Sequence, residues 1–531
     1  MSEHVRAARY ARALTVCLAL ALVAALPSCT QGEGDVTLRV LASPELADLG
    51  TLLDELKDDT GVELDMDYTA TVDLAGQPSS SGRSSYDLAW LASDRSFLLR
   101  LQDAGQATRP ESTPIMRSPV VVGLAPDVAD KLRAGASGGR PSWADVADAA
   151  ADGTVRFGMA DPRRSDTGRA ALVGVATAAA GTGRALREQD VACDRLRGFR
   201  SGQALTGARS RELLDSYVVH QDDANALIAH ESELLSLNAT GKLREPLEIV
   251  YPEDGMVLSD FPLMLLDPGQ RSAYRTVVDW LRREDIQKEL MERTWRRPVS
   301  QDVSHVPQLR ASVGNALSYP GQLSIVKKLI ADYGDPGRHT TDQVVFLLDF
   351  SGSMRGKRMA GLRAAFAGLS GADRTSTGKF ARFYRGERLT VVRFGGSVLQ
   401  ERTVTVTDSE DLRTLNALVA DGGLDASTAV WSALDRGYRI AAAAVRDGPD
   451  RPVSIVLMTD GESNAGIGYE EFLRRYGELG AAARAVPTFP VHLGEADAAA
   501  LRRTASATGG RMVDADLSSL SDAFKEIRGC H

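Results

Sequence analysis

The segment QVVFLLD, residues 343–349, is followed directly by FSGSM, residues 350–354. Such a nearly unbroken apolar run is typical of a central strand in a parallel sheet, because that strand is covered on both faces. The run ends in Asp349, and the next residues place Ser351 and Ser353 at alternate positions, with a glycine between them that allows a tight turn. The sequence therefore predicts an α/β fold with oxygen-bearing side chains at the carboxyl edge of its sheet.

Two further segments lead to the same edge. VSIVLMT, residues 453–459, is a second apolar run and ends at Asp460, while Thr428 opens the predicted helix TAVWSALDRGYRIAAAAV. Ligands of open parallel sheets gather at the carboxyl ends of the strands, so these loops are expected to share one crevice. Carboxylates and hydroxyls without a soft donor suit a hard cation such as Mg²⁺, or alternatively Mn²⁺ or Ca²⁺.

This combination resembles the von Willebrand factor A (VWA) family and its metal-ion-dependent adhesion site, over about residues 343–527. The resemblance implies that the cation is held by Asp349, Ser351, Ser353, Thr428 and Asp460. It also implies that a carboxylate from a protein partner completes the metal shell, so binding is expected and not catalysis. Ser427 stands where the family usually has glycine and is an alternative hydroxyl ligand. The competing interpretation is that the serines cap a helix and Asp460 starts a turn.

The region from Asp35 to Val299 alternates short apolar strands with amphipathic helices, which indicates βαβ units and an α/β class. The segments LASPEL, YDLAWLAS, SPVVVGLAPDVADKL, FGMADPRRSDTGRAAL, ESELLSLN and YPEDGMVLSDFPLML resemble those of bacterial extracellular solute-binding proteins, a class that includes receptors for molybdate or sulfate. The resemblance implies two α/β lobes that close over a ligand.

Four hydroxyl groups are expected to face the cleft between these lobes: Ser43, Ser93, Ser165 and Thr167. Hydroxyls and free N–H groups at a helix N-terminus favour an anion. Helix capping is the alternative role for each of them. Asp166 lies in the same turn and argues against an oxyanion unless its side chain faces away.

The N-terminus has the order of an export signal. Three arginines (Arg6, Arg9 and Arg12) precede an apolar run, residues 13–26, that is shorter than the roughly 20 residues of a membrane-spanning helix. Leu26-Pro27-Ser28-Cys29 resembles the bacterial lipobox, which implies that Cys29 is diacylated and tethers the mature protein to the extracytoplasmic face of the cell membrane. An ordinary signal peptide with an incidental cysteine is the alternative.

These features predict four segments: a lipoprotein signal (1–29), a solute-binding-like domain (30–306), a linker (307–342) and a doubly wound, mostly parallel-sheet VWA domain (343–531). With Cys17 removed and Cys29 acylated, Cys193 and Cys530 remain, and they either form a disulfide or stay unpaired. The formal net charge of -9 argues against nucleic-acid binding.

The function predicted is a lipid-anchored binding protein that holds a protein partner through a divalent cation, with a first domain of unknown ligand. The alternative is a receptor of an ABC-type transport system that binds a small solute or anion and carries the VWA domain as an accessory.

Overall fold

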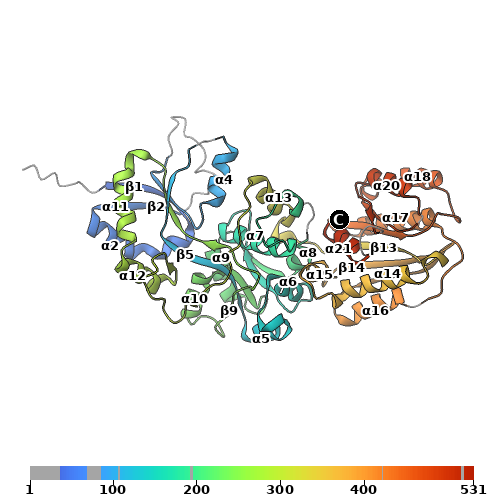
Figure 1. Cartoon of the computed structure of the whole chain (residues 1–531), viewed down its shortest axis with the longest axis horizontal. Coiled ribbons are helices and arrows are strands. Elements are labelled where there is room, and N and C mark those ends of the chain that lie inside the picture. Colours follow the sequence, from blue (N-terminus) through green and yellow to red (C-terminus); the bar gives the residue numbers. More distant parts are fainter. Residues whose placement is uncertain are drawn as a thin grey trace, which may run out of the picture.

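The computed structural model describes residues 36–68, 85–105, 108–191, 195–420, 422–494, 496–515 and 520–530. Three β-sheets build it, and the corresponding bodies follow one another along the long axis of the molecule (Figure 1). Two of them are the lobes of an N-terminal domain, and the third is a C-terminal domain. Within the described ranges, no helix combines the length and the apolar character needed to cross a bilayer.

The first lobe is a five-stranded sheet of order β2-β1-β3-β11-β4, in which β1 runs parallel to β2 and β3 while β11 is antiparallel. Its strands are β1 (Val36–Ala42), β2 (Val62–Asp67), β3 (Leu88–Trp90), β4 (Glu111–Pro114) and β11 (Pro262–Leu265). Its helical segments are η1 (Pro44–Leu49), α2 (Gly50–Thr60), α4 (Arg95–Asp103), α11 (Arg271–Leu281) and α12 (Glu284–Thr294). Gly61 ends α2 in the left-handed conformation (φ 70°) that favours glycine.

The second lobe is a sheet of order β10-β5-β8-β6-β7, with β9 and β12 also paired to β5. Its strands are β5 (Met116–Leu124), β6 (Phe157–Ala160), β7 (Gln203–Gly207), β8 (Ala226–His230), β9 (Glu248–Val250), β10 (Leu258–Ser259) and β12 (Arg297–Pro298). Its helices are α5 (Pro126–Gly135), α6 (Trp143–Ala151), α7 (Asp166–Ala180), α8 (Arg197–Ser201), α9 (Ser210–Val219) and α10 (Glu231–Ala239). The chain passes between the lobes from β4 to β5 and from β10 to β11, which gives the two-lobed α/β architecture expected from the sequence.

The segment between the domains, predicted as a linker, contains helix α13 (Leu323–Tyr333). Ile325, Leu329 and Tyr333 belong to the hydrophobic core of the second lobe. The Tyr319 hydroxyl, just before the helix, lies 3.0 Å from the Ser96 hydroxyl of the first lobe. Residues 307–342 therefore pack against both lobes.

The C-terminal domain is a six-stranded sheet of order β15-β14-β13-β16-β17-β18, parallel except for the β14–β15 pair. Its strands are β13 (Gln343–Asp349), β14 (Arg388–Phe394), β15 (Val398–Thr405), β16 (Val453–Thr459), β17 (Thr488–His492) and β18 (Val513–Asp514). Its helices include α14 (Lys357–Ala367), α15 (Ser376–Ala381), α16 (Ser409–Ala420), α17 (Val430–Asp447), α18 (Tyr469–Gly477), α19 (Ala481–Arg484), α20 (Ala498–Ala507) and α21 (Leu520–Cys530).

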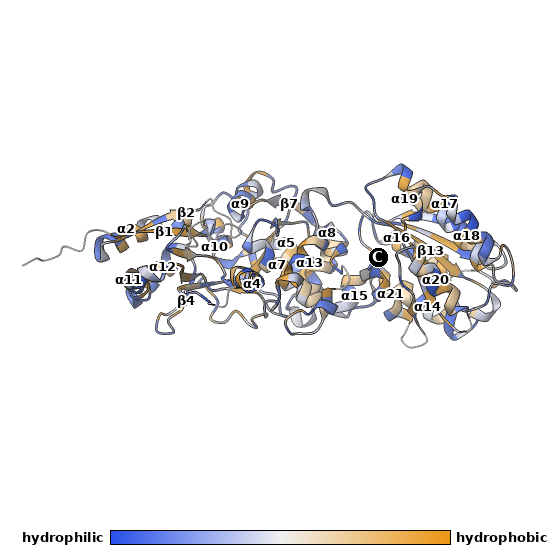
Figure 2. Cartoon of the chain, turned by 90° about the horizontal axis from the view of Figure 1, so that it is seen from above, coloured by the Kyte–Doolittle hydropathy of each residue, from blue (hydrophilic) through white to orange (hydrophobic). Residues whose placement is uncertain are grey.

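Helices cover both faces of this sheet, as a doubly wound fold requires. Helices α14, α16 and α21 pack with Phe346 and Leu348 of β13 on one face, while α17, α18 and α20 pack with Val345 and Leu347 on the other. All residues of β13 and β16 are buried, which explains the apolar runs in the sequence. Hydrophobic residues accordingly gather on the strands and on the inward faces of the helices (Figure 2).

The C-terminal domain is docked on the second lobe through α15, which contacts α6, α7 and α8. Phe380 of α15 is 6% exposed and belongs to the hydrophobic core of that lobe. Lys379 forms an ion pair with Asp145, and Arg382 forms one with Asp148 (2.5 Å), all four side chains being largely buried. The docking surface thus combines an aromatic side chain inserted into the neighbouring core with charged pairs around it.

Candidate functional site

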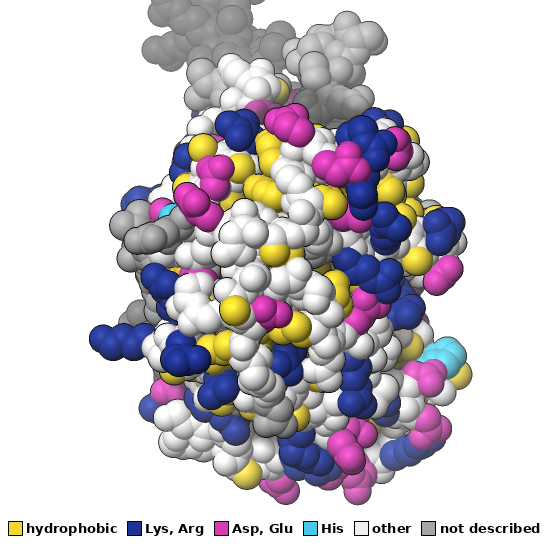
Figure 3. All heavy atoms as spheres, turned by 90° about the vertical axis from the view of Figure 1, so that its right-hand side faces the viewer, with side chains coloured by type: hydrophobic (Ala, Val, Ile, Leu, Met, Phe, Trp, Pro, Cys, Tyr) yellow, Lys and Arg dark blue, Asp and Glu magenta, His cyan; other side chains and the backbone are white. Residues whose placement is uncertain are grey.

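The candidate metal site lies at the carboxyl edge of the C-terminal sheet, where β13 and β16 end. The opposite, amino edge faces the second lobe, because Asp342, directly before β13, forms an ion pair with Arg197 (3.1 Å) and the Arg385 amide, shortly before β14, donates to the carbonyl of Ala151 (2.7 Å). The carboxyl edge therefore points away from the first domain. Basic and acidic side chains are interspersed on that end of the molecule (Figure 3).

Asp349 ends β13 with a fully buried side chain. One carboxylate oxygen accepts the Ser351 amide (2.8 Å), and the other accepts the Thr459 hydroxyl at the end of β16 (2.7 Å). Burial raises the pKa of the Asp349 carboxyl above its ordinary value, and the nearby Asp460 carboxylate acts in the same direction. Both effects disfavour the charged form of this buried acid.

Ser351, Ser353 and Asp460 form a chain of oxygen atoms beside Asp349. The hydroxyls of Ser351 and Ser353 are 3.0 Å apart, and Ser353 donates to Asp460 Oδ1 at 2.8 Å. Asp460 is 1% exposed, since it follows directly on the central strand β16. The first and third loops predicted from the sequence are thus in direct contact.

Thr428 comes from the second predicted loop, two residues before α17 begins. The loop is held by the Asp425 amide, which donates to the Phe350 carbonyl (2.8 Å), and by the Asn464 side chain, which accepts the Thr428 amide (2.8 Å). A side-chain carbon on Gly461 would lie 3.5 Å from Ser353 Oγ and 3.7 Å from Thr428 Oγ1, so both hydroxyls border the space in front of Gly461. Ser427 packs against Gly396 instead.

Arg358 of α14 occupies the outer side of this group of oxygens. Its guanidinium donates to Asp460 Oδ2 at 2.5 Å and to the Ser353 carbonyl at 3.3 Å. Because the Asp460 side chain is fully buried while that of Arg358 is 39% exposed, the arginine supplies the positive charge that the buried carboxylate requires. Nothing in the sequence pattern singled out this arginine.

The donor set fits a hard divalent cation. Asp349, Ser351, Ser353, Thr428 and Asp460 offer only carboxylate and hydroxyl oxygens, and the space in front of Gly461 is one that a side-chain carbon would fill. A cation held by these residues would supply positive charge that attracts an incoming ligand oxygen. The protein's own residues fix the orientation of the oxygens through the backbone hydrogen bonds described above.

The first-domain cleft brings together two of its four predicted residues. Thr167 donates to Glu45 Oε1 (3.0 Å), and the Ser43 hydroxyl hydrogen-bonds to Glu45 Oε2. Ser210 also donates to Glu45 Oε1 (3.3 Å). The sequence reasoning missed Glu45 and Ser210, although Glu45 lies in the quoted LASPEL segment.

The other two predicted residues have local roles. The Ser165 hydroxyl caps α7 by accepting the Gly168 amide (3.2 Å), and the Ser93 hydroxyl accepts the Arg95 amide (3.3 Å). Asp166 turns to Arg169, with which it forms a buried ion pair, so its charge does not face the cleft. Ser165 therefore has the helix-capping role considered as its alternative, whereas Ser93 bonds within the turn before α4, whose N-cap residue is Asp94.

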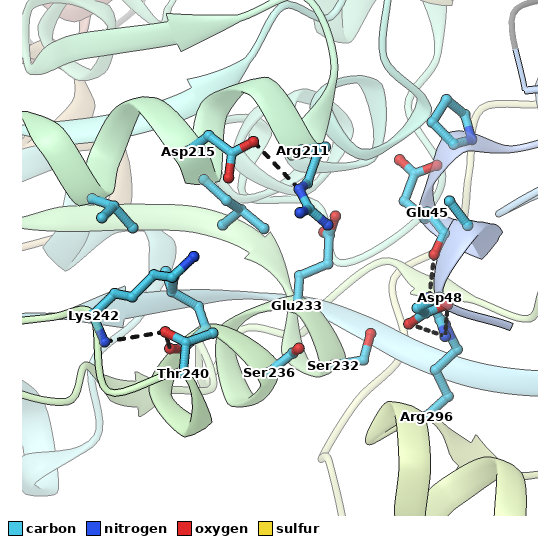
Figure 4. A pocket seen from close by; sticks show the side chains of 15 residues that line it. Glu45, Asp48, Arg211, Asp215, Ser232, Glu233, Ser236, Thr240, Lys242 and Arg296 are labelled. Atoms are coloured by element: carbon cyan, nitrogen blue, oxygen red, sulfur yellow. Dashed lines mark hydrogen bonds and ion pairs between the residues drawn. The ribbon is translucent and has the colours of Figure 1, made fainter. Parts of the chain in front are cut away.

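A cavity of about 410 Å³ opens next to Glu45, between the lobes. Figure 4 shows Glu45, Asp48 and Arg296 on one side of it and residues of α9 and α10 on the other. Arg296 pairs with Asp48 (2.8 Å), and Arg211 pairs with Asp215 (3.3 Å). Deeper in the cleft, ligand atoms of Glu45, His230 and Glu233 lie within 4.8 Å of one another.

The predicted lipidation and disulfide fall outside this description. Cys29 and Cys193 lie outside the described residues. Cys530 is the last residue of α21, and its side chain is not among those that the structure describes. The acylation of Cys29 and the pairing of Cys193 with Cys530 therefore stay predictions.

Two known families match the chain, and the boundary between the two matches falls between the N-terminal two-lobed domain and the C-terminal sheet. Residues 38–295 match the family model of bacterial extracellular solute-binding proteins, and residues 343–526 match that of the von Willebrand factor type A domain. No curated protein sequence matches the chain significantly.

Solved structures similar to the chain include three bacterial binding proteins. The substrate-binding protein of an ABC transporter from Agrobacterium tumefaciens is 14% identical, with a TM-score of 0.43, and the match covers 58% of this chain and 96% of that protein. The ferric binding protein from Campylobacter jejuni is 14% identical (TM-score 0.43; 56% and 99% covered). Iron-bound HitA from Pseudomonas aeruginosa is 19% identical (TM-score 0.43; 56% and 100% covered). At these scores the assignment of the first domain rests on the family model.

Proposed function

We propose that this chain, which joins a bacterial extracellular solute-binding domain to a von Willebrand factor type A domain, is an extracytoplasmic binding protein that holds a protein partner through a divalent cation. The cation ligands in this proposal are Asp349, Ser351, Ser353, Thr428 and Asp460, with Mg²⁺ as the first candidate ion. A carboxylate of the partner completes the metal shell. Diacylated Cys29 tethers the protein to the cell membrane.

The observation that carries the proposal is the convergence of three loops on one group of hard oxygen atoms. Ser353 lies 2.8 Å from Asp460 although 107 residues separate them, and Thr428 borders the same space in front of Gly461. A buried carboxylate without a cationic partner is costly, and Asp349 is buried and forms no ion pair with a lysine or arginine among the residues that the structure describes. A bound divalent cation removes that cost and leaves positions for a partner's oxygen.

The location of these residues also suits capture of a large ligand. They lie at the edge of the sheet that points away from the first domain, so a folded partner meets no obstruction from the two lobes. None of the side-chain hydrogen bonds described for these oxygens involves a histidine, and binding is the activity proposed.

The direct test is titration calorimetry of the mature chain, residues 30–531, with Mg²⁺ and Mn²⁺. We expect saturable one-site binding in wild type and its loss in Asp349→Ala. The matched control is Asp450→Ala, an exposed aspartate at the opposite edge of the same domain, which should bind like wild type. At a cation concentration of about 100 times the Kd, the wild-type fold should gain roughly 2.7 kcal/mol. Equal binding by wild type and Asp349→Ala contradicts the site.

Partner binding is tested with the same variants as baits for the cell-envelope proteins of the producing bacterium. A partner should be retained by wild type and Asp450→Ala in Mg²⁺ and released by EDTA, whereas Asp349→Ala should not retain it. A partner that binds all three baits equally in EDTA contradicts the metal-dependent mechanism.

The second candidate function is that of a solute receptor for an ABC-type transporter. The cavity of about 410 Å³ between the lobes favours it, because solute-binding domains hold their ligands between two lobes. Calorimetric binding of a small solute that depends on cavity residues such as Arg296 would support this function.

A further inference from the structure

The carboxylate of Glu45 connects the two lobes of the first domain. Glu45 lies in η1 of the first lobe, whereas Thr167 and Ser210, which donate to its Oε1 at 3.0 and 3.3 Å, lie at the starts of α7 and α9 in the second lobe. Ser43, from its own lobe, bonds to Oε2. The hydroxyl-bearing residues are 4%, 1% and 3% exposed for Ser43, Thr167 and Ser210, so these bonds are shielded from water.

No lysine or arginine of the described chain forms an ion pair with this carboxylate. The nearby Arg296 donates to the Glu45 backbone carbonyl (2.5 Å) and pairs through its guanidinium with Asp48. The carboxylate of Glu45 is therefore hydrogen-bonded by hydroxyl groups at the N-terminal ends of α7 and α9, where the helix dipole favours an anion, and the buried Arg169 of α7 attracts it electrostatically.

This donor set is the one expected from the sequence for an oxyanion solute. The Ser43 hydroxyl, after the first strand of one lobe, and the Thr167 hydroxyl, at a helix start of the other lobe, point to the same place. The oxygen atoms that they bind there belong to the Glu45 carboxylate and not to a solute. We propose that Glu45 is an internal ligand, which occupies the position of a small anion between the lobes and holds the first domain closed without a solute.

His230 of the second lobe contacts Thr167 and so belongs to the same hydrogen-bond network as Glu45. It is fully buried at the end of β8, its Nδ1 lies 3.2 Å from Glu233 Oε2 and 3.3 Å from Thr167 Oγ1, and its Nε2 lies 2.9 Å from the Ser259 hydroxyl. A proton on Nδ1 is shared by Glu233 and Thr167, which leaves the Thr167 hydroxyl hydrogen for Glu45. The single hydroxyl hydrogen of Ser210 is shared between Glu45 Oε1 (3.3 Å) and Thr167 Oγ1 (3.0 Å), so these side chains form one connected network of donors and acceptors.

The cavity beside Glu45 gives this carboxylate room to leave its position. Glu45 lines the cavity together with Ser232, which is 2% exposed and whose hydroxyl has no hydrogen-bond partner within the described chain. The space beside Glu45 thus lies between the lobes and is bordered on the second lobe by a hydroxyl group without a hydrogen-bond partner in the described chain.

The test compares wild type, Glu45→Ala and the control Glu284→Ala, an exposed glutamate on α12 of the same lobe, by small-angle X-ray scattering and hydrogen exchange. Glu45→Ala should have a larger radius of gyration and at least about tenfold faster amide exchange at the starts of α7 and α9, because two charge-assisted hydrogen bonds between the lobes are lost. Sodium acetate or sulfate should restore the closed form of Glu45→Ala and have no effect on wild type or Glu284→Ala.

A second variant distinguishes loss of the Glu45 contact between the lobes from a general folding defect. Thr167→Val combined with Ser210→Ala keeps the carboxylate but removes its donors in the second lobe, so it should open like Glu45→Ala and should not respond to acetate. A closed Glu45→Ala, or a wild type that binds sulfate in calorimetry, overturns the proposal. A third result also overturns it: wild type binds Zn²⁺ or Mn²⁺, and this binding is lost in His230→Ala but kept in Asp349→Ala. In that case Glu45, His230 and Glu233 form a cation site.

Discussion

Truncation of Phe380 tests how firmly the C-terminal domain is docked on the second lobe. The ring is 6% exposed and is part of the core of that lobe, although it belongs to a helix of the other domain. Phe→Ala substitutions in cores cost roughly 3–5 kcal/mol, and because α15 lies at a surface between domains we take the lower value of about 3 kcal/mol. At 1.4 kcal/mol per tenfold change, Phe380→Ala should lower the docked-to-undocked ratio more than about a hundredfold.

Hydrogen exchange and calorimetry read this change directly. Exchange should accelerate in α15 and in the facing helix α6, while β13 stays protected, and the melting temperature of the docked unit should fall by about 6 °C at roughly 2 °C per kcal/mol. Leu399→Ala is the control, because this side chain is 41% exposed on the edge strand β15 of the same domain. If Phe380→Ala exchanges like wild type in α15 and α6, the ring contributes little to docking and the reasoning is refuted.

Three further predictions concern single side chains. Arg358→Ala removes the guanidinium from Asp460, so calorimetry should show divalent-cation affinity raised roughly tenfold, since an interaction with a charged group contributes about 1.5–3 kcal/mol; unchanged or weaker binding would contradict this. Burial raises the pKa of Asp254 to about 6, so the folded state binds its proton more tightly than the unfolded chain does, and stability should fall as pH rises from about 4 to 6; Asp254→Asn should flatten that slope in urea unfolding. Arg528→Leu leaves Glu387 buried without its ion pair and should cost about 3–5 kcal/mol, seen as a lower melting temperature, whereas a shift below 1 °C would refute it.

The strands at the centre of the C-terminal domain could be predicted from local sequence. QVVFLLD and VSIVLMT coincide with β13 and β16. A strand that is buried on both faces requires an unbroken apolar run, and few other structures produce an apolar run of this length. The segment VTLRVLA, residues 36–42, coincides with β1 as well, although its first two residues and Arg39 are exposed. The extracellular solute-binding domain and the VWA domain inferred from such segments are both confirmed by the family models.

Features that depend on distant packing could not be predicted in this way. Glu45 and Thr167 are 122 residues apart, and their contact exists because η1 of one lobe packs against the helix starts of the other. Likewise, Arg358 reaches Asp460 only because the Gly352–Met354 turn sets the start of α14 beside β16. The short helix α15 carries no sequence signal for the neighbouring domain on which it docks.

The orientation of the C-terminal sheet has a mechanical consequence. Its amino edge is joined to the second lobe, its carboxyl edge carries the candidate site, and the first strand of the described chain lies at the far end of the molecule (Figure 1). If the chain is tethered and pulled by a partner, as proposed above, it is loaded lengthwise along β13, whose hydrogen bonds to β14 and β16 resist together in shear. Tension then passes from Asp342 to the second lobe, so the lobe-to-lobe contact, and not the C-terminal sheet, is the first element expected to yield under load.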